Sequence, residues 1–154
     1  MIPAVPPPDT QPVTLECVVE VSRRYQVPVE IIAGILAQER GRLGTRSPNR
    51  NGTEDLGPMQ INTFWLRTLG RYGITENHML HHGCYNVAVG AWIVSYEQAR
   101  GRQPLWQAVG RYHSPDPARA SGYARKVAGK VRDLLSGRLT MAGILRYANR
   151  GYGH

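Results

Sequence analysis

The sequence lacks any apolar run that approaches the roughly 20 residues needed to cross a bilayer. It also lacks an internal repeat, a low-complexity linker and a series of β-strand patterns. Among the 154 residues there are only 2 cysteines. These absences exclude a membrane-spanning protein, a repeat array and a disulfide-stapled mini-protein. The length suits one domain, which would bury about two-thirds of its unfolded surface around a single core.

The charge of the chain is one-sided. Lysine and arginine together number 19 against 11 aspartates and glutamates, which gives a formal net charge of +8. A net positive charge of this size favours a polyanionic partner: nucleic acid, an anionic lipid surface or a carboxylate-bearing bacterial cell wall. Because the arginines are scattered and no nucleic-acid-binding motif occurs, the basic end RYANRGYGH is interpreted as solvated, and no nucleic-acid partner is expected.

The first 13 residues, MIPAVPPPDTQPV, contain five prolines. This composition predicts a flexible, extended arm over residues 1–13 that does not join a core. The segment has neither the basic start nor the apolar stretch of a signal peptide, so it is not interpreted as one. The sequence leaves open whether such a peptide has been removed or export follows another route.

Helical periodicity fills most of the remaining chain. Pro28 separates a first helix, beginning at Leu15, from a second helix over residues 29–40. The apolar side of the first helix is expected to hold Val18, Val19 and Tyr25. Further helices are expected over residues 63–69, 76–82, 84–101 and 118–135, after Pro104, and after a capping threonine at Thr140.

Residues 41–57 hold four glycines and show no periodicity, which predicts a loop. Within it, Asn51-Gly52 suits the tight turn of a small hairpin around NRNGT. The predicted fold class is therefore all-α, or at most α+β with one small β-hairpin. A compact helical domain is expected over residues 14–136, followed by a short basic helix and tail over residues 137–154.

Glu39 closes the apolar run VEIIAGILA of the second helix. On a helix it lies one turn beyond Ile35 and Leu36 and two turns beyond Ile32, so it continues the apolar stripe. A carboxyl held against such a surface loses solvation of its charged form. This raises its pKa and suits a general acid.

Two observations weigh against an acid role. The helix could fray at Gly41, which would turn Glu39 into water, as for most glutamates at helix ends. The guanidinium of Arg40 would favour the charged carboxylate and lower its pKa unless that side chain points away. Support for an acid role of Glu39 therefore has to come from other residues.

A second cluster, DLGPMQIN over residues 55–62, favours a carbohydrate site. Gly57 permits an unusual backbone conformation. Met59, Gln60 and Asn62 would present soft apolar contacts and amide hydrogen bonds. Amide groups together with an aromatic side chain such as Trp65 are the groups that a sugar site uses.

Four motifs, in this order, resemble the lytic transglycosylases of the lysozyme-like superfamily. They are Glu39 with its Gly/Asn-rich loop, DLGPMQIN with Trp65, CYNVAVGAWIV, and GRYHSPDP with Tyr123. The likeness covers about residues 17–131 and is greatest to the small enzymes of conjugation, pilus and type III and IV secretion systems. It implies a lysozyme-like helical domain with a substrate cleft and no cofactor.

The resemblance also implies roles for individual residues. Glu39 would be the single catalytic acid and base, and Asp55 would be structural. Tyr123 matches the tyrosine that such enzymes aim at the catalytic carboxyl, and His113 replaces a substrate-contacting asparagine, so its charge would vary with pH. The substrate-binding positions would be Gly57, Met59, Gln60, Ile61, Asn62, Tyr112, His113 and Tyr123.

The implied reaction cleaves the β-1,4 bond between N-acetylmuramic acid and N-acetylglucosamine in peptidoglycan and leaves 1,6-anhydromuramoyl ends. A monomer in the periplasm or cell wall would thereby open the wall for a secretion, pilus or conjugation apparatus. The alternative is a non-catalytic component of such an apparatus that binds peptidoglycan.

By number alone, Cys17 and Cys84 could form a disulfide or remain two buried thiols. The resemblance favours the disulfide, since secretion-associated members carry a similar pair, and this in turn implies an oxidising compartment. His78, His81 and His82 lie at helical spacing, but no carboxylate or cysteine completes a ligand set except Cys84, which the disulfide would use, so no metal site is expected.

Overall fold

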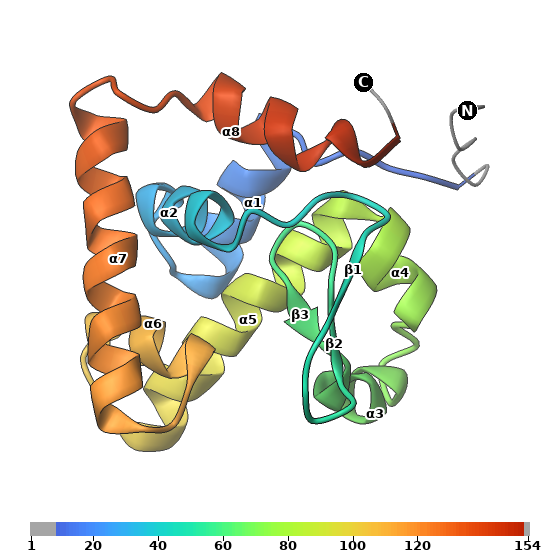
Figure 1. Ribbon diagram of the computed structural model, residues 1–154, viewed down its shortest axis with the longest axis horizontal. Coiled ribbons are helices and arrows are strands. Elements are labelled where there is room, and N and C mark those ends of the chain that lie inside the picture. The colour runs from blue at the N-terminus through green and yellow to red at the C-terminus, as the bar shows by residue number, and fades with distance from the viewer. Residues whose placement is uncertain (1–8, 153–154) are drawn as a thin grey trace.

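The computed structural model describes residues 9–152, and most of these are helical (Figure 1). Two short 3-10 helices, η1 (Thr63–Trp65) and η2 (Arg150–Tyr152), accompany the α-helices. The α-helices are α1 (Leu15–Tyr25), α2 (Val29–Glu39), α3 (Leu66–Gly70), α4 (Glu76–His81), α5 (Gly83–Gly101), α6 (Leu105–His113), α7 (Pro117–Leu135) and α8 (Met141–Ala148).

Local signals explain where the helices begin and end. The side chains of Thr14, Asp116 and Thr140 accept backbone N–H bonds at the starts of α1, α7 and α8. Pro28 precedes α2, and Arg40 ends it in the left-handed conformation at φ 54°. The predicted helices are confirmed, with ends that differ by about one residue, except that the helix expected over residues 63–69 is divided into η1 and α3.

The core is centred on α2 and α5. Residues 31–36 of α2 are all buried, and α2 packs on α1, α7 and α8. Gly34 lets α7 approach closely, because a Cβ atom there would lie 3.0 Å from Cγ2 of Val131. In α1, Val18 and Val21 face this core. Val19, expected on the same apolar side, is 39 % exposed.

A small antiparallel sheet lies beside the helices, formed in the order β1 (Arg46–Pro48), β2 (Glu54–Leu56) and β3 (Ile61–Asn62). The turn between β1 and β2 contains Gly52 at φ 87°, which confirms the predicted hairpin. The sequence does not predict β3, because two residues are too few to show periodicity. The molecule is thus mostly helical with a small sheet, as the sequence predicts.

The N-terminal segment runs beside the C-terminal end of α8 (Figure 1). The N–H of Val13 donates to Oδ1 of Asn149 at 2.8 Å, and Nδ2 of Asn149 donates to the Val13 carbonyl at 2.9 Å. Gln11 bridges to His82. The expectation that residues 1–13 do not join a core is wrong for Val13, which is buried because this backbone pairing holds it there. Residues 1–8 lie outside the described part.

The C-terminal helix α8 belongs to the same body as the helices before it. Ile144 lies in the common core, and the carbonyl of Ala148 accepts a hydrogen bond from the N–H of Leu43 at 2.8 Å. The predicted boundary between residues 136 and 137 therefore does not separate α8 from the domain. The reason is that the apolar face of α8 packs on α2.

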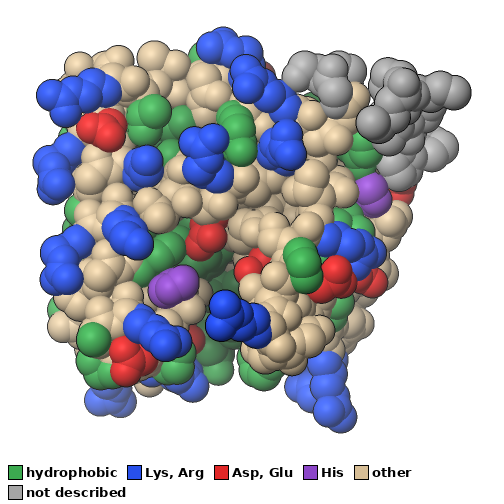
Figure 2. Space-filling model, in the orientation of Figure 1, with side chains coloured by type: hydrophobic (Ala, Val, Ile, Leu, Met, Phe, Trp, Pro, Cys, Tyr) green, Lys and Arg blue, Asp and Glu red, His purple; other side chains and the backbone are tan. Residues whose placement is uncertain are grey.

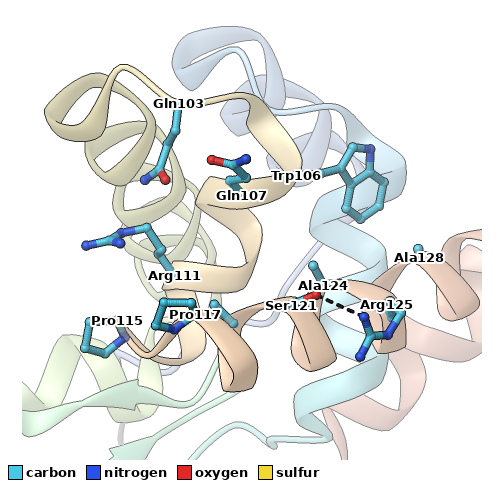
Figure 3. A pocket seen from close by; sticks show the side chains of 11 residues that line it. Gln103, Trp106, Gln107, Arg111, Pro115, Pro117, Ser121, Ala124, Arg125 and Ala128 are labelled. Atoms are coloured by element: carbon cyan, nitrogen blue, oxygen red, sulfur yellow. Dashed lines mark hydrogen bonds between the residues drawn. The ribbon is translucent and has the colours of Figure 1, made fainter.

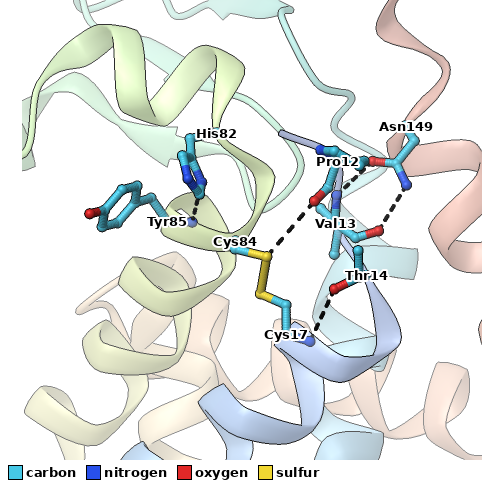
Figure 4. Close-up of a disulfide and its surroundings, with 8 residues drawn as sticks. All are labelled: Pro12, Val13, Thr14, Cys17, His82, Cys84, Tyr85 and Asn149. Carbon is cyan, nitrogen blue, oxygen red and sulfur yellow. Dashed lines mark hydrogen bonds between the residues drawn. A yellow bond between two sulfur atoms is a disulfide. The ribbon is translucent and has the colours of Figure 1, made fainter. Parts of the chain in front are cut away.

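A disulfide joins Cys17 in α1 to Cys84 in α5, with Cα atoms 5.8 Å apart (Figure 4). It links positions 67 residues apart, so in the chain-entropy description it stabilises the fold by roughly 4 kcal/mol. The bridge lies next to the docked segment of Pro12 and Val13. Within residues 9–152, no helix combines the length and apolar character needed to cross a membrane.

Candidate functional site

Glu39 lies at the end of the buried stripe of α2 and faces a cleft. Ile32, Ile35 and Leu36 of this stripe are buried. The helix does not fray before Glu39, because the N–H of Arg40 still donates to the carbonyl of Leu36 at 3.1 Å. The carboxyl is therefore held half-buried against an apolar surface, with its end open to the cleft.

The pKa of the Glu39 carboxyl is raised from 4.5 to about 7. Burial is the largest cause, since it disfavours the charged form. The hydroxyl of Tyr123 donates to Oε1 at 2.8 Å and opposes the rise by stabilising the anion, while the negative charge of Asp55 adds to it. Glu39 therefore exists in both protonated and ionised forms near neutral pH.

Arg40 does not bind the carboxyl of Glu39. Its left-handed backbone ends α2, and its guanidinium carbon lies 4.7 Å from the ring centroid of Tyr147 in α8. This is a cation–π contact, which draws the charge toward the aromatic ring. The lowering of the Glu39 pKa that a neighbouring arginine could cause is thereby avoided.

Three aromatic rings from α6 and α7 stack beside Glu39. The ring of His113 is nearly parallel to that of Tyr123, with centroids 4.8 Å apart, and Tyr112 stacks on Tyr123 at 6.3 Å. Burial raises the pKa of both tyrosines well above the usual range, so both hydroxyls act as donors. Burial, followed by two nearby cations of α7, lowers the pKa of His113.

The loop between β2 and β3 is held in place by Asn86 of α5. Its Oδ1 accepts from the N–H of Met59 at 2.7 Å, and its Nδ2 donates to the carbonyls of Leu56 at 2.9 Å and Met79 at 2.8 Å. Gly57, at φ 66°, turns the loop so that it fits against these groups. Asn86 is fully buried, and its position within the apolar stretch CYNVAVGAWIV is the signal that could have identified it.

Met59 does not line the cleft with its side chain, contrary to the expectation from the sequence. The side chain is 0 % exposed and packs against Gly90, because Gly57 and Gln60, both at positive φ, turn it inward. Its carbonyl instead accepts a hydrogen bond from the hydroxyl of Tyr112. Gly57 likewise contributes its backbone conformation rather than a surface in the cleft.

The residues that follow Met59 do line the cleft. Gln60 donates from Nε2 to the carbonyl of Gly57 at 3.1 Å, which fixes its amide group beside the loop. Ile61 is buried apart from its face in the cleft. Nδ2 of Asn62 donates to Oδ1 of Asp55 at 3.0 Å, so the side-chain amide of Asn62 is hydrogen-bonded to the carboxylate of Asp55.

The cleft has a volume of about 510 Å³, with a helical wall and a sheet wall. The helical wall carries Glu39, Tyr112 and His113, whereas Tyr123 lines a smaller hollow that adjoins the cleft. In Figure 2, acidic side chains lie inside a hollow near the middle of the face, with basic and histidine side chains around it. Tertiary packing adds further lining residues for which the sequence predicts no role in substrate binding: Asn49, Arg50, Asn51, Ile93, Ser114 and Arg119.

A second groove, of about 730 Å³, lies between α6 and α7 on another face of α7 (Figure 3). Trp106, Gln107 and Arg111 line it from α6. Arg125 lines it from α7 and donates to the hydroxyl of Ser121 at 3.0 Å. None of the described residues that line this groove carries a carboxyl group, in contrast to the cleft.

The histidines of α4 and of the α4–α5 junction make local contacts. The rings of His78 and His82 lie 4.9 and 4.3 Å from that of Tyr85, and His81 contacts Tyr152. Between residues 9 and 152, no group of three or more histidine, cysteine, aspartate or glutamate side chains is placed to hold a metal ion.

Similarity to known proteins was found at the level of individual sequences, and no model of a protein family matches the chain. The chain is 32 % identical to the invasion protein IagB of Salmonella typhimurium over 117 residues, which cover 75 % of this chain and 72 % of IagB. It is 31 % identical to the protein IpgF of Shigella flexneri over 101 residues, or 64 % of this chain and 65 % of IpgF. The chain therefore belongs to the family of the invasion protein IagB.

Proposed function

We propose that the protein is a lytic transglycosylase that cleaves the β-1,4 bond between N-acetylmuramic acid and N-acetylglucosamine in peptidoglycan. Glu39 is the single acid and base of this reaction. One observation carries the proposal: the Glu39 carboxyl lies on a cleft, bonded to the Tyr123 hydroxyl, with a pKa raised by burial to about 7. Such a carboxyl can both donate and accept a proton near neutral pH.

The reaction proceeds in two proton transfers. The protonated Glu39 carboxyl donates its proton to the glycosidic oxygen, and the bond from this oxygen to C1 of the muramoyl residue breaks. The acetamido group of that residue stabilises the positive charge at C1. The ionised carboxylate then takes the proton of the C6 hydroxyl while O6 bonds to C1, which leaves a 1,6-anhydro end. No water is consumed, so the enzyme is a lyase.

This scheme needs no second carboxylate, unlike most glycoside hydrolases. Asp55 is the other carboxyl group that lines the cleft, and it accepts a hydrogen bond from Asn62. We assign Asp55 to the sheet wall, where it holds Asn62. Burial raises the pKa of Glu39, and the charge of Asp55 contributes to the same rise.

The glycan strand occupies the cleft between the two walls. Amide, apolar and aromatic groups on the sheet wall suit N-acetylated sugars, which offer both hydrogen-bonding groups and apolar ring faces. The loop shape depends on Gly57 and Met59, and Tyr123 positions the carboxyl of Glu39. Contacts with the strand are assigned to Gln60, Ile61, Asn62, Trp65, Tyr112 and His113.

The proposed cellular role is local opening of the cell wall for a secretion or transfer apparatus. One relative in this family is named an invasion protein. The disulfide between Cys17 and Cys84 fits an oxidising compartment such as a periplasm. The net charge of +8 suits contact with an anionic wall.

Digestion of purified peptidoglycan, followed by mass spectrometry of the released fragments, tests the activity. The wild-type protein should release fragments with 1,6-anhydro ends, each lighter by one water than the fragment that hydrolysis of the same bond would give. Glu39→Gln should lose at least about 100-fold in rate, since it removes the acid and base. Glu30→Gln is the matched control, because Glu30 is exposed at the other end of α2 and should behave as the wild type.

Other outcomes would contradict the proposal in recognisable ways. Reducing ends in the fragments would indicate a hydrolase, with Asp55 as the second carboxylate. Full activity in Glu39→Gln would remove Glu39 from the reaction. Binding of peptidoglycan without release of any fragment would favour a non-catalytic component that holds the wall.

A further inference from the structure

The smaller hollow beside Glu39 is basic. It has a volume of about 310 Å³ and shares Glu39, His113 and Arg119 with the cleft. Gly122 and Lys126 of α7 also line it. We call this hollow the basic annex. Any ligand that places a reacting bond at Glu39 therefore has the annex as its immediate neighbour.

The annex is built on one face of α7. Arg119, Gly122 and Lys126 follow each other at three and four residues, which brings them to the same side of the helix as Tyr123. A Cβ atom added to Gly122 would meet nothing within 4 Å, so open space lies between the two cations. Since Tyr123 holds Glu39, this face of α7 presents two positive charges beside the carboxyl.

The two cations have no acidic partner in the part of the chain that the structure describes. Arg119 and Lys126 are exposed, and neither belongs to an ion pair there. After burial, their charges are the next causes that lower the pKa of His113, so both act on this hollow. The annex thus presents two unpaired positive charges around open space.

The geometry points to a carboxylate-binding site in which Arg119 and Lys126 hold the side chain on O3 of the muramoyl residue whose bond is cleaved. This inference rests on the proposed function. Arginine binds a carboxylate through two parallel N–H bonds and lysine acts as a compact positive charge, so the pair matches the chemistry of the annex.

The chemistry of the substrate explains why this side chain reaches the annex. The bond at Glu39 starts from C1 of the muramoyl ring, and C3 of the same ring carries a lactyl ether. Its carboxyl group is either free or extended by a peptide that bears its own carboxylates. Both forms supply an anion close to the reacting bond, whereas a strand of N-acetylglucosamine alone supplies none.

A double variant, Arg119→Gln with Lys126→Gln, tests the annex. Its matched control is Arg125→Gln with Arg132→Gln, which removes two charges at the same spacing from another face of α7. Rates of fragment release are measured on three soluble substrates: peptide-bearing strands, the same strands with all carboxyls amidated, and strands stripped by an amidase to free lactyl groups.

We expect the annex variant to lose at least about 10-fold in kcat/KM on peptide-bearing strands, mainly through a higher KM, because one tenfold step corresponds to loss of about one charge-assisted hydrogen bond. The control should match the wild type. On amidated strands, wild type and annex variant should be equal. A loss that persists on stripped strands identifies the lactyl carboxylate as the ligand, and a loss confined to peptide-bearing strands identifies the peptide.

Equal rates of wild type and annex variant on both anionic substrates would overturn the inference. The same loss on amidated strands would also overturn it, since that would show a structural effect. Binding of each strand to Glu39→Gln, with and without the annex substitutions, provides a readout that needs no turnover. If the wild type releases no fragments, the proposed function fails, and this binding comparison still decides whether the annex recognises carboxylates.

Gly122→Leu provides a second variant that keeps both charges. Leucine favours a helix more than glycine does, and its Cβ meets open space, so the fold should be retained. The side chain would fill the annex and should lower kcat/KM on peptide-bearing strands more than on a fourth substrate, strands stripped by the amidase and then amidated, which carry only a short neutral group on O3. An equal loss on these two substrates would contradict the assignment of this space to the O3 side chain.

Discussion

The two walls of the cleft hold their functional groups by different means. Glu39 and Tyr123 stand on α2 and α7, whose apolar faces form the core, so packing determines where the carboxyl lies. Gln60 and Asn62 lie on or beside a two-residue strand, whose position depends on Gly57 and on the hydrogen bonds of Asn86. The acid is thus placed by burial, and the amides are placed by backbone geometry.

The walls meet immediately after α2. A Cβ atom on Gly41 would lie 2.7 Å from the carbonyl oxygen of Pro58 and 2.9 Å from Nε2 of Gln60. The hydroxyl of Tyr112 bonds across to the carbonyl of Met59. These contacts set the distance between the carboxyl of Glu39 and the amide groups of the sheet wall. A displacement of either wall is therefore transmitted to the other at this point.

The largest expected effect is on the pH dependence of the free energy of unfolding, to which Glu39 in the helical wall contributes. The pKa of Glu39 rises from 4.5 to about 7 through burial, so the stability it contributes is complete below pH 4.5 and is lost as pH rises through about 7. The wild type should lose at most about 3 kcal/mol relative to Glu39→Gln between pH 4.5 and 8. Urea unfolding at several pH values checks this. Equal pH dependence of the two proteins would contradict it, and Glu30→Gln should follow the wild type.

Gly41→Ala should separate the two walls. The added methyl group overlaps the loop that carries Pro58 and Gln60, which should cost about 1 to 3 kcal/mol in the free energy of unfolding and lower the rate of peptidoglycan cleavage. Thermal unfolding and fragment release measure both effects. Gly70→Ala is the control, since nothing lies within 4 Å of its added atom. If the two variants match in stability and rate, the close approach at Gly41 does not join the walls.

Tyr123→Phe changes the helical wall without removing the acid. The hydrogen bond from Tyr123 lowers the pKa of Glu39, so its loss should raise this pKa above about 7. Protonated Glu39 would then persist to higher pH. The alkaline limb of kcat/KM should move up in pH, although the rate falls because the carboxyl is less well positioned. An unchanged limb would show that this bond does not control the proton.

Asp55→Asn is the counterpart on the sheet wall and should have the smallest effect. Burial raises the pKa of Glu39 most, and the charge of Asp55 adds to the rise, so its removal should lower this pKa. The alkaline limb should therefore move down in pH, opposite to Tyr123→Phe, while most activity remains. A shift in the same direction as Tyr123→Phe would contradict the opposite influence of the two walls.

The helices and the position of Glu39 could be predicted because their signals are local. Apolar spacing places Ile32, Ile35 and Glu39 on one side of α2, and Asn51-Gly52 marks the hairpin turn. The burial of Val13 could not be predicted, because its neighbours are proline-rich and its hydrogen-bond partner, Asn149, lies 136 positions away. The third strand could not be predicted for a similar reason, since its pairing with β2 defines it and its two residues show no periodicity.

The sequence by itself determined the helical class and an apolar stripe that ends in Glu39, since these depend on residues within a few turns of one another. Only the tertiary structure decided what surrounds that carboxyl. Packing brings Tyr123 to Glu39 from 84 residues away, turns Arg40 toward Tyr147 and Met59 into the core, and places Arg119 beside the cleft. These contacts arise when helices bury their apolar faces together, and no local pattern encodes them.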